Sequence, residues 1–372
     1  MGLDSEGKPL HVAMPRFRMS HEDMADLVAY MKKLGLEGEA GVSDQEVRIG
    51  LVLPPAGPLT PLGETVRAAL AERFERINRE GGVYGRRLAL RTFEPPAGPA
   101  SRGAVAGFLE REEIFAGVAA FFAGADAELA ALFSERQVPL IGPFTLHTPD
   151  ASPNRHVFYL HPGTGEQVRA LAGFACSRPD LARPAVLAPA EASLGAMVEA
   201  IGQACPRWPS ATVLRYPAGS FDPGDLARRL EEADPVFFLG SGQEAVALAR
   251  ALEGRPPHLL LTGGSADGSL FAAPRSFQDR IILAIPDLAP GSESLQRTAL
   301  AAAEVLHEGL RRAGRDLTRE RLIEALEGLR AFPTGLSQPV TYGPGHRLGI
   351  RQPWLVSLDL EGRKLVPVPR EP

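Results

Sequence analysis

The feature that most constrains the fold of this chain is a regular alternation of short apolar runs with helical patterns from residue 46 onward. Apolar runs of strand length, bounded by glycine or proline, occur at 47–53, 88–93, 115–122, 138–142, 184–188, 211–216, 235–239, 258–262 and 281–285. Stretches with helical apolar spacing lie between most of them, at 65–78, 102–112, 125–136, 165–176, 193–204, 225–232, 243–253, 293–313 and 319–329. Strands separated by helices form right-handed βαβ units, so the pattern predicts an α/β fold with mainly parallel sheets.

These strands are more than one sheet comfortably holds, so we expect two doubly wound parallel-sheet lobes joined by a multi-strand hinge. The hinge is expected to pass through 158–163, where an apolar run enters a glycine-proline turn. The first lobe then comprises 46–160 and 286–334, and the second comprises 161–285 and 335–372. A chain of 372 residues is long enough for both.

Composition excludes several classes of protein. The 40 basic and 45 acidic side chains give a net charge of −5 without a basic block, which argues against a nucleic-acid partner. Two cysteines make neither a disulfide-dense scaffold nor a four-cysteine zinc site. The eight histidines lack metal-ligand spacing, and we expect neither a metal nor a cofactor in this chain.

One sequence resembles a cofactor motif. Gly240-Ser-Gly-Gln-Glu-Ala245 has the form of a dinucleotide fingerprint at a strand-to-helix turn, but no acidic residue ends the next strand at 258–262. A nicotinamide-dependent oxidoreductase is therefore the weakest alternative. Because no nucleophile–base set occurs either, we expect that the protein is not an enzyme.

The two cysteines pose an open question. Cys176 and Cys205 fall at the predicted ends of the two helices that flank the strand at 184–188. A disulfide is feasible if their Cα atoms lie within about 7 Å, whereas helices on opposite faces of the sheet forbid it. Both arrangements stay open.

In the segment before the α/β body, the apolar spacing predicts one amphipathic helix at 20–34. Ser20 and Asp23 form a Ser-x-x-Asp signal for its start. A polar linker at 36–45 follows it, and Met1 to Lys8 do not read as a signal peptide.

With Met14-Pro15 just upstream, residues 10–35 resemble the end of a class I cytochrome c, a family in which the methionine is the distal haem ligand. No Cys-x-x-Cys-His occurs, so Met14 is a haem-ligand candidate only if a haem domain precedes this chain. The resemblance implies an exported parent chain, and the alternative is an ordinary capped helix.

The α/β body resembles the type I periplasmic solute-binding proteins, in the leucine/isoleucine/valine-binding family of ABC-transporter receptors. The stretches that carry the resemblance are 47–63 with 77–88, 138–143, 157–158 with Gln167, and 332–345 with Arg347. It covers about residues 46–369 and implies two lobes, three hinge crossings and closure on a ligand. It also implies a periplasmic location and a membrane permease as partner.

In parallel sheets ligands bind beyond the carboxyl ends of the strands. The loops at those ends contain the candidate ligand-binding residues Leu59, Phe121, Phe122, Ala123, Gly124, Phe144, Thr145, Leu194, Ser241, Gly242, Ser265 and Asp267. By resemblance, 123–124 and 144–145 match the places where the family holds its ligand's α-carboxylate. Core packing of Phe121 and Phe122 is the alternative for these aromatic residues. Helix capping or another loop role is the alternative for Ser241 and Ser265.

Helix N-termini that follow these loops offer unpaired amides, so we expect a small carboxylate as ligand. It is either an amino acid or, as the apolar candidates favour, an organic or aromatic acid that lacks an amine. Ser265 stands near where the family places an acidic residue for the ammonium group, and Asp267 is offset from it by about two residues. We expect an extracytoplasmic receptor of an ABC-type uptake system. The alternative is a ligand-sensing module coupled to a c-type cytochrome. The ligand's identity and the oligomeric state stay open.

Overall fold

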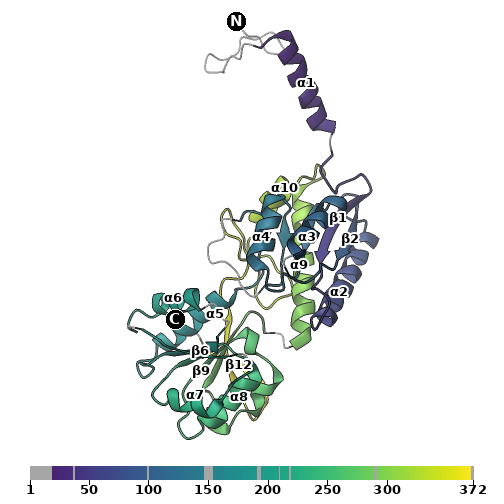
Figure 1. Ribbon diagram of the computed structural model, residues 1–372. Coiled ribbons are helices and arrows are strands. Elements are labelled where there is room, and N and C mark those ends of the chain that lie inside the picture. Colours follow the sequence, from purple (N-terminus) through teal and green to yellow (C-terminus); the bar gives the residue numbers. More distant parts are fainter. Residues whose placement is uncertain are drawn as a thin grey trace. The chain divides into compact units, whose positions relative to one another are not determined.

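The structure, a computed structural model, describes residues 19–36, 38–98, 100–145, 154–190, 194–208, 210–217, 219–288 and 291–369. The chain divides into two compact units, Met1–Glu39 and Ala40–Pro372, and each is described by itself (Figure 1).

The first unit contains helix α1 (His21–Leu36), which confirms the helix predicted there. The amide of Asp23 donates to Ser20 Oγ at 3.0 Å, so the predicted start signal caps the helix. Met24, with 48% of its surface exposed, lies in the predicted apolar stripe. Met14 lies outside the described residues. The resemblance to a cytochrome c end, and the ligand-sensing function inferred from it, therefore stay predictions.

The first lobe of the second unit is built on a sheet of five parallel strands in the order β2-β1-β3-β4-β5. The strands are β1 (Glu46–Val52), β2 (Arg87–Phe93), β3 (Ala116–Val118), β4 (Leu140–Ile141) and β5 (Val157–Phe158). One face packs against α2 (Thr60–Arg79), α9 (Gly291–Ala313) and α10 (Arg319–Glu327). The other packs against α3 (Ala100–Arg111) and α4 (Asp126–Glu135). Helices on both faces make this lobe doubly wound.

The second lobe has a seven-stranded sheet in the order β12-β11-β10-β9-β8-β6-β7. Its parallel strands are β6 (Ala185–Pro189), β7 (Thr212–Tyr216), β8 (Val236–Phe238), β9 (Leu259–Thr262) and β10 (Ile281–Ile285). Strands β11 (Trp354–Asp359) and β12 (Lys364–Pro367) extend the sheet antiparallel. All five residues of β10 are buried, as expected for a strand covered on both faces.

Helices cover both faces of this second sheet as well. Helices α5 (Thr164–Cys176) and α6 (Gly195–Ala204) pack on one face. The other face carries α7 (Pro223–Arg229), α8 (Gly242–Ala251) and the short 3-10 helices η2 (Gly268–Ala272) and η3 (Arg275–Phe277). A further 3-10 turn, η1 (Gly263–Ser265), follows β9. The predicted pair of doubly wound lobes is confirmed.

The expected second-lobe segment 335–372 differs from the structure in its first part. Val340, Tyr342 and Ile350 lie in the core of the first lobe, and Val340 pairs with Phe332. The chain joins the second sheet only at β11. The segment 332–350 forms isolated bridges and no regular helix or strand. Its sequence therefore has no apolar periodicity from which its place in the first-lobe core could be predicted.

Within the described ranges, the chain passes between the lobes after β5, after β10 and before β11. The first and third of these connections lie side by side, because the amide of Gly349 donates to Tyr159 O at 2.8 Å and that of Ile350 to Leu160 O at 2.9 Å. The hinge is thus a small hydrogen-bonded unit.

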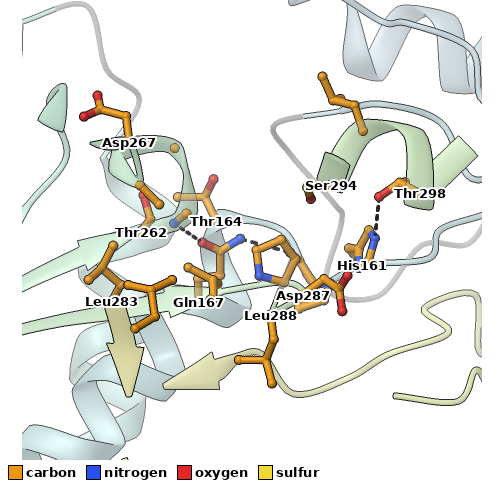
Figure 2. A pocket seen from close by; sticks show the side chains of 18 of the residues that line it. His161, Thr164, Gln167, Thr262, Asp267, Leu283, Asp287, Leu288, Ser294 and Thr298 are labelled. Carbon is orange, nitrogen blue, oxygen red and sulfur yellow. Dashed lines mark hydrogen bonds between the residues drawn. The ribbon is translucent and has the colours of Figure 1, made fainter. Parts of the chain in front are cut away.

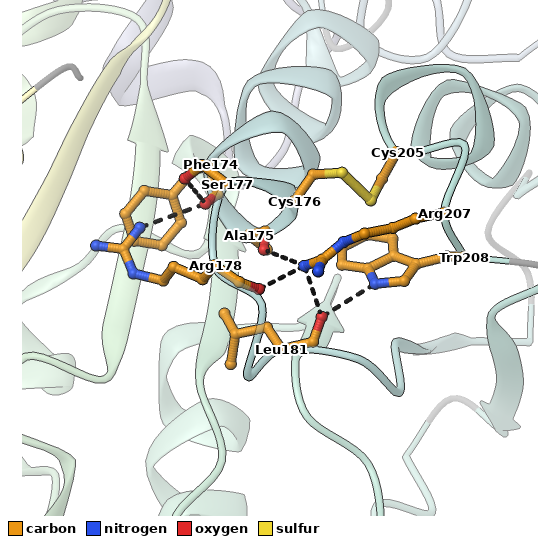
Figure 3. Close-up of a disulfide and its surroundings, with 9 residues drawn as sticks. All are labelled: Phe174, Ala175, Cys176, Ser177, Arg178, Leu181, Cys205, Arg207 and Trp208. Carbon is orange, nitrogen blue, oxygen red and sulfur yellow. Dashed lines mark hydrogen bonds between the residues drawn. A yellow bond between two sulfur atoms is a disulfide. The ribbon is translucent and has the colours of Figure 1, made fainter. Parts of the chain in front are cut away.

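The question of the two cysteines is settled by helix placement. Helices α5 and α6 share one face of the second sheet, and Cys176 and Cys205 form a disulfide with a Cα–Cα distance of 5.4 Å (Figure 3). Beside it, the indole N–H of Trp208 donates to Leu181 O at 3.0 Å. The disulfide therefore joins two neighbouring helices at their C-terminal ends.

Candidate functional site

A cavity of about 800 Å³ lies where the two lobes meet the hinge. The first lobe contributes residues 143–145, which follow β4, and part of the first turns of α9. The hinge contributes residues 159–163 and 286–288, and the second lobe contributes the turn after β9. Because both lobes and the hinge form its walls, relative movement of the lobes changes its shape.

Gln167, in the first turn of α5, holds the polar side of this cavity together (Figure 2). Its side-chain amide donates to Pro162 O at 3.1 Å, and its Oε1 accepts from the amide of Gly263 at 2.8 Å. The side chain is buried, with 8% of the residue exposed. Gln167 therefore links the hinge to the turn after β9 and fixes the position of that turn.

His161 lies on the hinge at the same side of the cavity (Figure 2). Its Nε2 is 3.0 Å from Thr298 Oγ1 of α9. Burial lowers the pKa of His161 to about 4, and the nearby charge of Asp287 only partly offsets this. At neutral pH the imidazole is therefore uncharged.

Asp287 begins the connection from β10 to α9 and is buried. Although burial alone raises the pKa of Asp287, hydrogen bonds from Ser337 and the charge of Arg297 together lower it below its ordinary value. The amide of Ser337 donates to Asp287 Oδ1 at 2.8 Å, and Arg297 Nε is 3.2 Å from Oδ2. This ionised carboxylate is thus neutralised by partners within the protein.

The rest of the lining is mixed. The lining includes hydroxyl groups of Thr164, Ser294 and Thr298 and apolar side chains of the second lobe such as Leu283, which lies beside Gln167 (Figure 2). Within the described ranges, no three His, Cys, Asp or Glu side chains gather as a metal site requires. The arrangement offers hydrogen bonds and apolar surface, which suits reversible binding of a small molecule.

Of the residues predicted from the sequence, Phe144, Thr145 and Asp267 line the cavity. Phe144 stacks on Phe121 with ring centroids 4.7 Å apart, and the hydroxyl of Thr145 donates to the Asp126 carboxylate.

Asp267 caps η2 by accepting from the amide of Ser269 at 2.8 Å. A Cβ added at Gly242 would lie 2.7 Å from the Asp267 carboxylate, so this glycine permits a close approach between the turn and the start of α8. Gly242 does not itself line the cavity.

Several other predicted residues serve the core or the helix ends instead. Phe121, Phe122 and Leu194 are buried in the hydrophobic clusters of their lobes. Ser241 forms a capping box with Glu244 at the start of α8. The alternatives of core packing and capping therefore account for these positions, and none of them lines the cavity.

The remaining predicted residues, Ser265, Leu59, Ala123 and Gly124, do not line the cavity. The Ser265 hydroxyl donates to Gly240 O at 2.6 Å, and this residue is buried beside the cavity wall. Leu59, Ala123 and Gly124 are exposed at the carboxyl ends of β1 and β3. The cavity lies nearer to β4 and β9, so these three residues are outside its lining.

Most cavity residues at the hinge were not predicted from the sequence. Asp287, Ser294 and Thr298 lie in no recognisable motif, and they reach the cavity only because α9 returns to the first lobe. His161 had a usable signal, since it precedes the proline-glycine turn of the predicted hinge. In the structure His161 lies within hydrogen-bonding distance of Thr298.

Comparison with known proteins matches this chain to binding proteins, both by a family model and by similar sequences. A family model described as periplasmic binding protein matches residues 46–256. Leu/Ile/Val-binding protein homolog 3 of Brucella melitensis biotype 1 is 24% identical over 327 residues, covering 80% of this chain and 88% of the relative.

Solved structures show the same fold at low identity. A fatty acid ABC transporter substrate-binding protein from Thermomonospora curvata superposes with a TM-score of 0.69 at 17% identity, covering 90% of this chain and 94% of that one. A branched chain amino acid ABC transporter protein from Thermus thermophilus with bound valine gives 0.68 at 18% identity, covering 88% and 96%. Among the described residues, no helix combines the length and apolar character needed to cross a bilayer.

Proposed function

Because this chain belongs to the periplasmic binding protein family, we propose that it is the solute-binding receptor of an ABC-type uptake system. It acts in the periplasm, delivers its solute to a membrane permease and performs no chemistry. The observation that carries the proposal is the cavity of about 800 Å³, whose walls come from both lobes and the hinge. Such a cavity encloses a solute when the lobes approach each other.

We infer that the solute is a small carboxylate. The amino acid bound in the Thermus relative and the fatty acid named for the Thermomonospora relative have a carboxylate in common. In this chain, helix α5 begins at the cavity with Gly163 as N-cap and without a side-chain cap. Its first amides and the hydroxyls of Ser294 and Thr298 suit an anionic group.

The acidic side chains of the cavity favour a solute that lacks an amine. The acidic side chains of the cavity have roles within the protein, because Asp267 caps η2 through the amide of Ser269 and Asp287 accepts from the amide of Ser337. Asp287 is also neutralised by Arg297. An organic or aromatic acid therefore fits the cavity better than an amino acid does.

Titration calorimetry tests this function on protein refolded from denaturant to remove any retained solute. The probes are leucine, short 2-oxo acids and benzoate. We expect saturable one-to-one binding of one class, and at 100 times its Kd a stabilisation of about 2.7 kcal/mol. Thr298→Val should weaken that binding because it removes a hydroxyl from the cavity, whereas Thr65→Val, on the exposed side of α2, should not. Folded protein that binds no class would refute the proposal.

A further inference from the structure

Two cations of the second lobe line the cavity. Arg363 ends the turn between β11 and β12, and Lys364 is the first residue of β12. Both residues are exposed, whereas most apolar residues of the same wall are buried in the core of the lobe. A solute in the cavity can therefore reach these two cations without any change in the packing of the lobe.

The position of Arg363 is set by the turn before it and by an aromatic neighbour. Asp359, the last residue of β11, accepts a hydrogen bond from the amide of Gly362 at 3.0 Å, which closes the turn. The guanidinium carbon of Arg363 lies 5.6 Å from the centre of the Phe271 ring, and Phe271 of η2 also lines the cavity. A guanidinium over a ring keeps the N–H groups of its edge available to a carboxylate.

The charge of Arg363 differs from the other charges of the lining. Lys364 Nζ lies 3.6 Å from Asp359 Oδ2, Asp287 is neutralised by its arginine partner, and Asp267 accepts hydrogen bonds at the cap of η2. Among the residues that the structure describes, no carboxylate lies within ion-pair distance of the Arg363 guanidinium. An anion that enters the cavity can therefore pair with Arg363 without displacing an acidic side chain.

A second set of groups that suits an anion lies on other elements of the lining. It consists of the first amides of α5 and the hydroxyls of Ser294 and Thr298, as described under the proposed function. Arg363, by contrast, lies against Phe271 of η2. A volume of about 800 Å³ falls within the range of cavities that enclose drug-sized ligands, so the cavity has room for a solute that contacts both sets.

We propose that the solute is a dicarboxylate, with one carboxylate at the start of α5 and the other paired with Arg363. This inference rests on the proposed function and specifies its substrate class. Arg363 then distinguishes dicarboxylates from monocarboxylates, because only a dicarboxylate occupies both places at once. The planar guanidinium donates two parallel hydrogen bonds to a carboxylate, which a lysine ammonium does not reproduce.

The test is titration calorimetry on the refolded full chain with pairs of acids that differ by one carboxylate. The pairs are pentanoate with pentanedioate and benzoate with benzene-1,3-dicarboxylate, and leucine is included for comparison. In at least one pair we expect the dicarboxylate to bind about three- to tenfold more tightly, as a partly exposed charge pair allows. Raising the ionic strength from about 0.01 M to about 0.15 M should reduce this advantage, because the Debye length falls from about 30 Å to about 8 Å.

Variants of Arg363 identify the contact. Arg363→Gln should weaken the preferred dicarboxylate about three- to tenfold and leave its monocarboxylate partner within about 1.5-fold. Arg363→Lys keeps the charge but loses the paired donors, so it should restore part of the lost affinity. Arg275→Gln is the matched control, because Arg275 is also a second-lobe arginine, its side chain is 86% exposed, and it does not line the cavity. The exposure of Arg363 favours folded variants, and circular dichroism verifies this.

The outcomes separate the two proposals. Equal affinities within both pairs, or an equal loss for the two acids of a pair in Arg363→Gln, would overturn the dicarboxylate assignment. Equal effects of Arg363→Gln and Arg275→Gln would overturn it too, because they would reflect the net charge of the lobe. Binding of leucine or a monocarboxylate without binding of either dicarboxylate would also overturn it but would leave the receptor function standing. Folded protein that binds none of these compounds would remove both.

Discussion

The two lobes share one framework but contribute unequally to the cavity. The parallel strands follow the same order in both, β2-β1-β3-β4-β5 in the first lobe and β7-β6-β8-β9-β10 in the second. Only the second lobe carries the antiparallel pair β11 and β12, and Leu358, Lys364 and Leu365 of that pair line the cavity. The comparison teaches that a shared βα framework leaves room for strands added in one lobe to reach the cavity.

The lobes also differ in what holds their outer parts together. In the first lobe Arg347 is buried against the Phe158 ring and pairs with Glu327 at 2.5 Å. In the second lobe, the disulfide between Cys176 and Cys205 joins α5 to α6. Substitutions can remove the ion pair, the disulfide and the hydrogen bonds that link the hinge to the second lobe, and the expected losses of stability decrease in that order.

The largest effect is expected for the buried ion pair. Arg347 also donates to Arg155 O at 2.9 Å and to Gly343 O at 2.8 Å. Arg347→Met leaves the Glu327 carboxylate without this partner and should lower the free energy of unfolding by about 3–5 kcal/mol, measured by urea denaturation. Arg275→Met, at an exposed pair with Glu361, is the control and should cost less than about 1 kcal/mol. Equal losses in the two variants would show that burial of the pair is unimportant.

The next effect is expected for the disulfide. The paired substitution Cys176→Ser with Cys205→Ser opens a loop with a sequence separation of 29 residues. Loop-closure entropy predicts a loss of about 3.5 kcal/mol in the free energy of unfolding. A reducing agent should destabilise the original chain by a similar amount and leave the double variant unchanged. Sensitivity of the double variant to the reducing agent would contradict this explanation.

The smallest effect is expected at the link between hinge and second lobe. Gln167→Ala removes the hydrogen bonds to Pro162 and Gly263 and should cost about 2 kcal/mol in unfolding free energy. It should also weaken solute binding, because the turn after β9 lines the cavity. Gln203→Ala on the exposed side of α6 is the control, since Gln203 bonds only its helix neighbour Glu199 among the contacts the structure describes. Unchanged binding in Gln167→Ala would show that this turn does not contribute to recognition.

The fold was predictable because its determinants are local. Runs such as Ile281–Ile285 are apolar without interruption, which is typical of a strand covered on both faces. The antiparallel strands β11 and β12 were not predicted. Strand β12 lies at the edge of the sheet, has only four residues, is largely exposed and ends in Pro367, so it gives a weak strand signal.

The site was less predictable. The candidates came from loops at the carboxyl ends of strands, after β1, β3, β4, β6, β8 and β9. Of these candidates, Phe144, Thr145 and Asp267 line the cavity. His161 and Asp287 lie far apart in the sequence and meet at the cavity only through the hinge. A search for motifs cannot find such pairs, since a motif requires residues close together in the chain.

The sequence by itself determined the alternation of strands and helices, and with it the two parallel-sheet lobes. It does so because apolar periodicity and turn residues act over a few neighbouring positions. Only the tertiary structure decided that α5 and α6 share a sheet face, so that Cys176 and Cys205 can join. It also decided that 332–350 packs in the first lobe and that residues of β10 to β12 reach the cavity. These features depend on which distant surfaces exclude water together, and no short segment of the sequence encodes that choice.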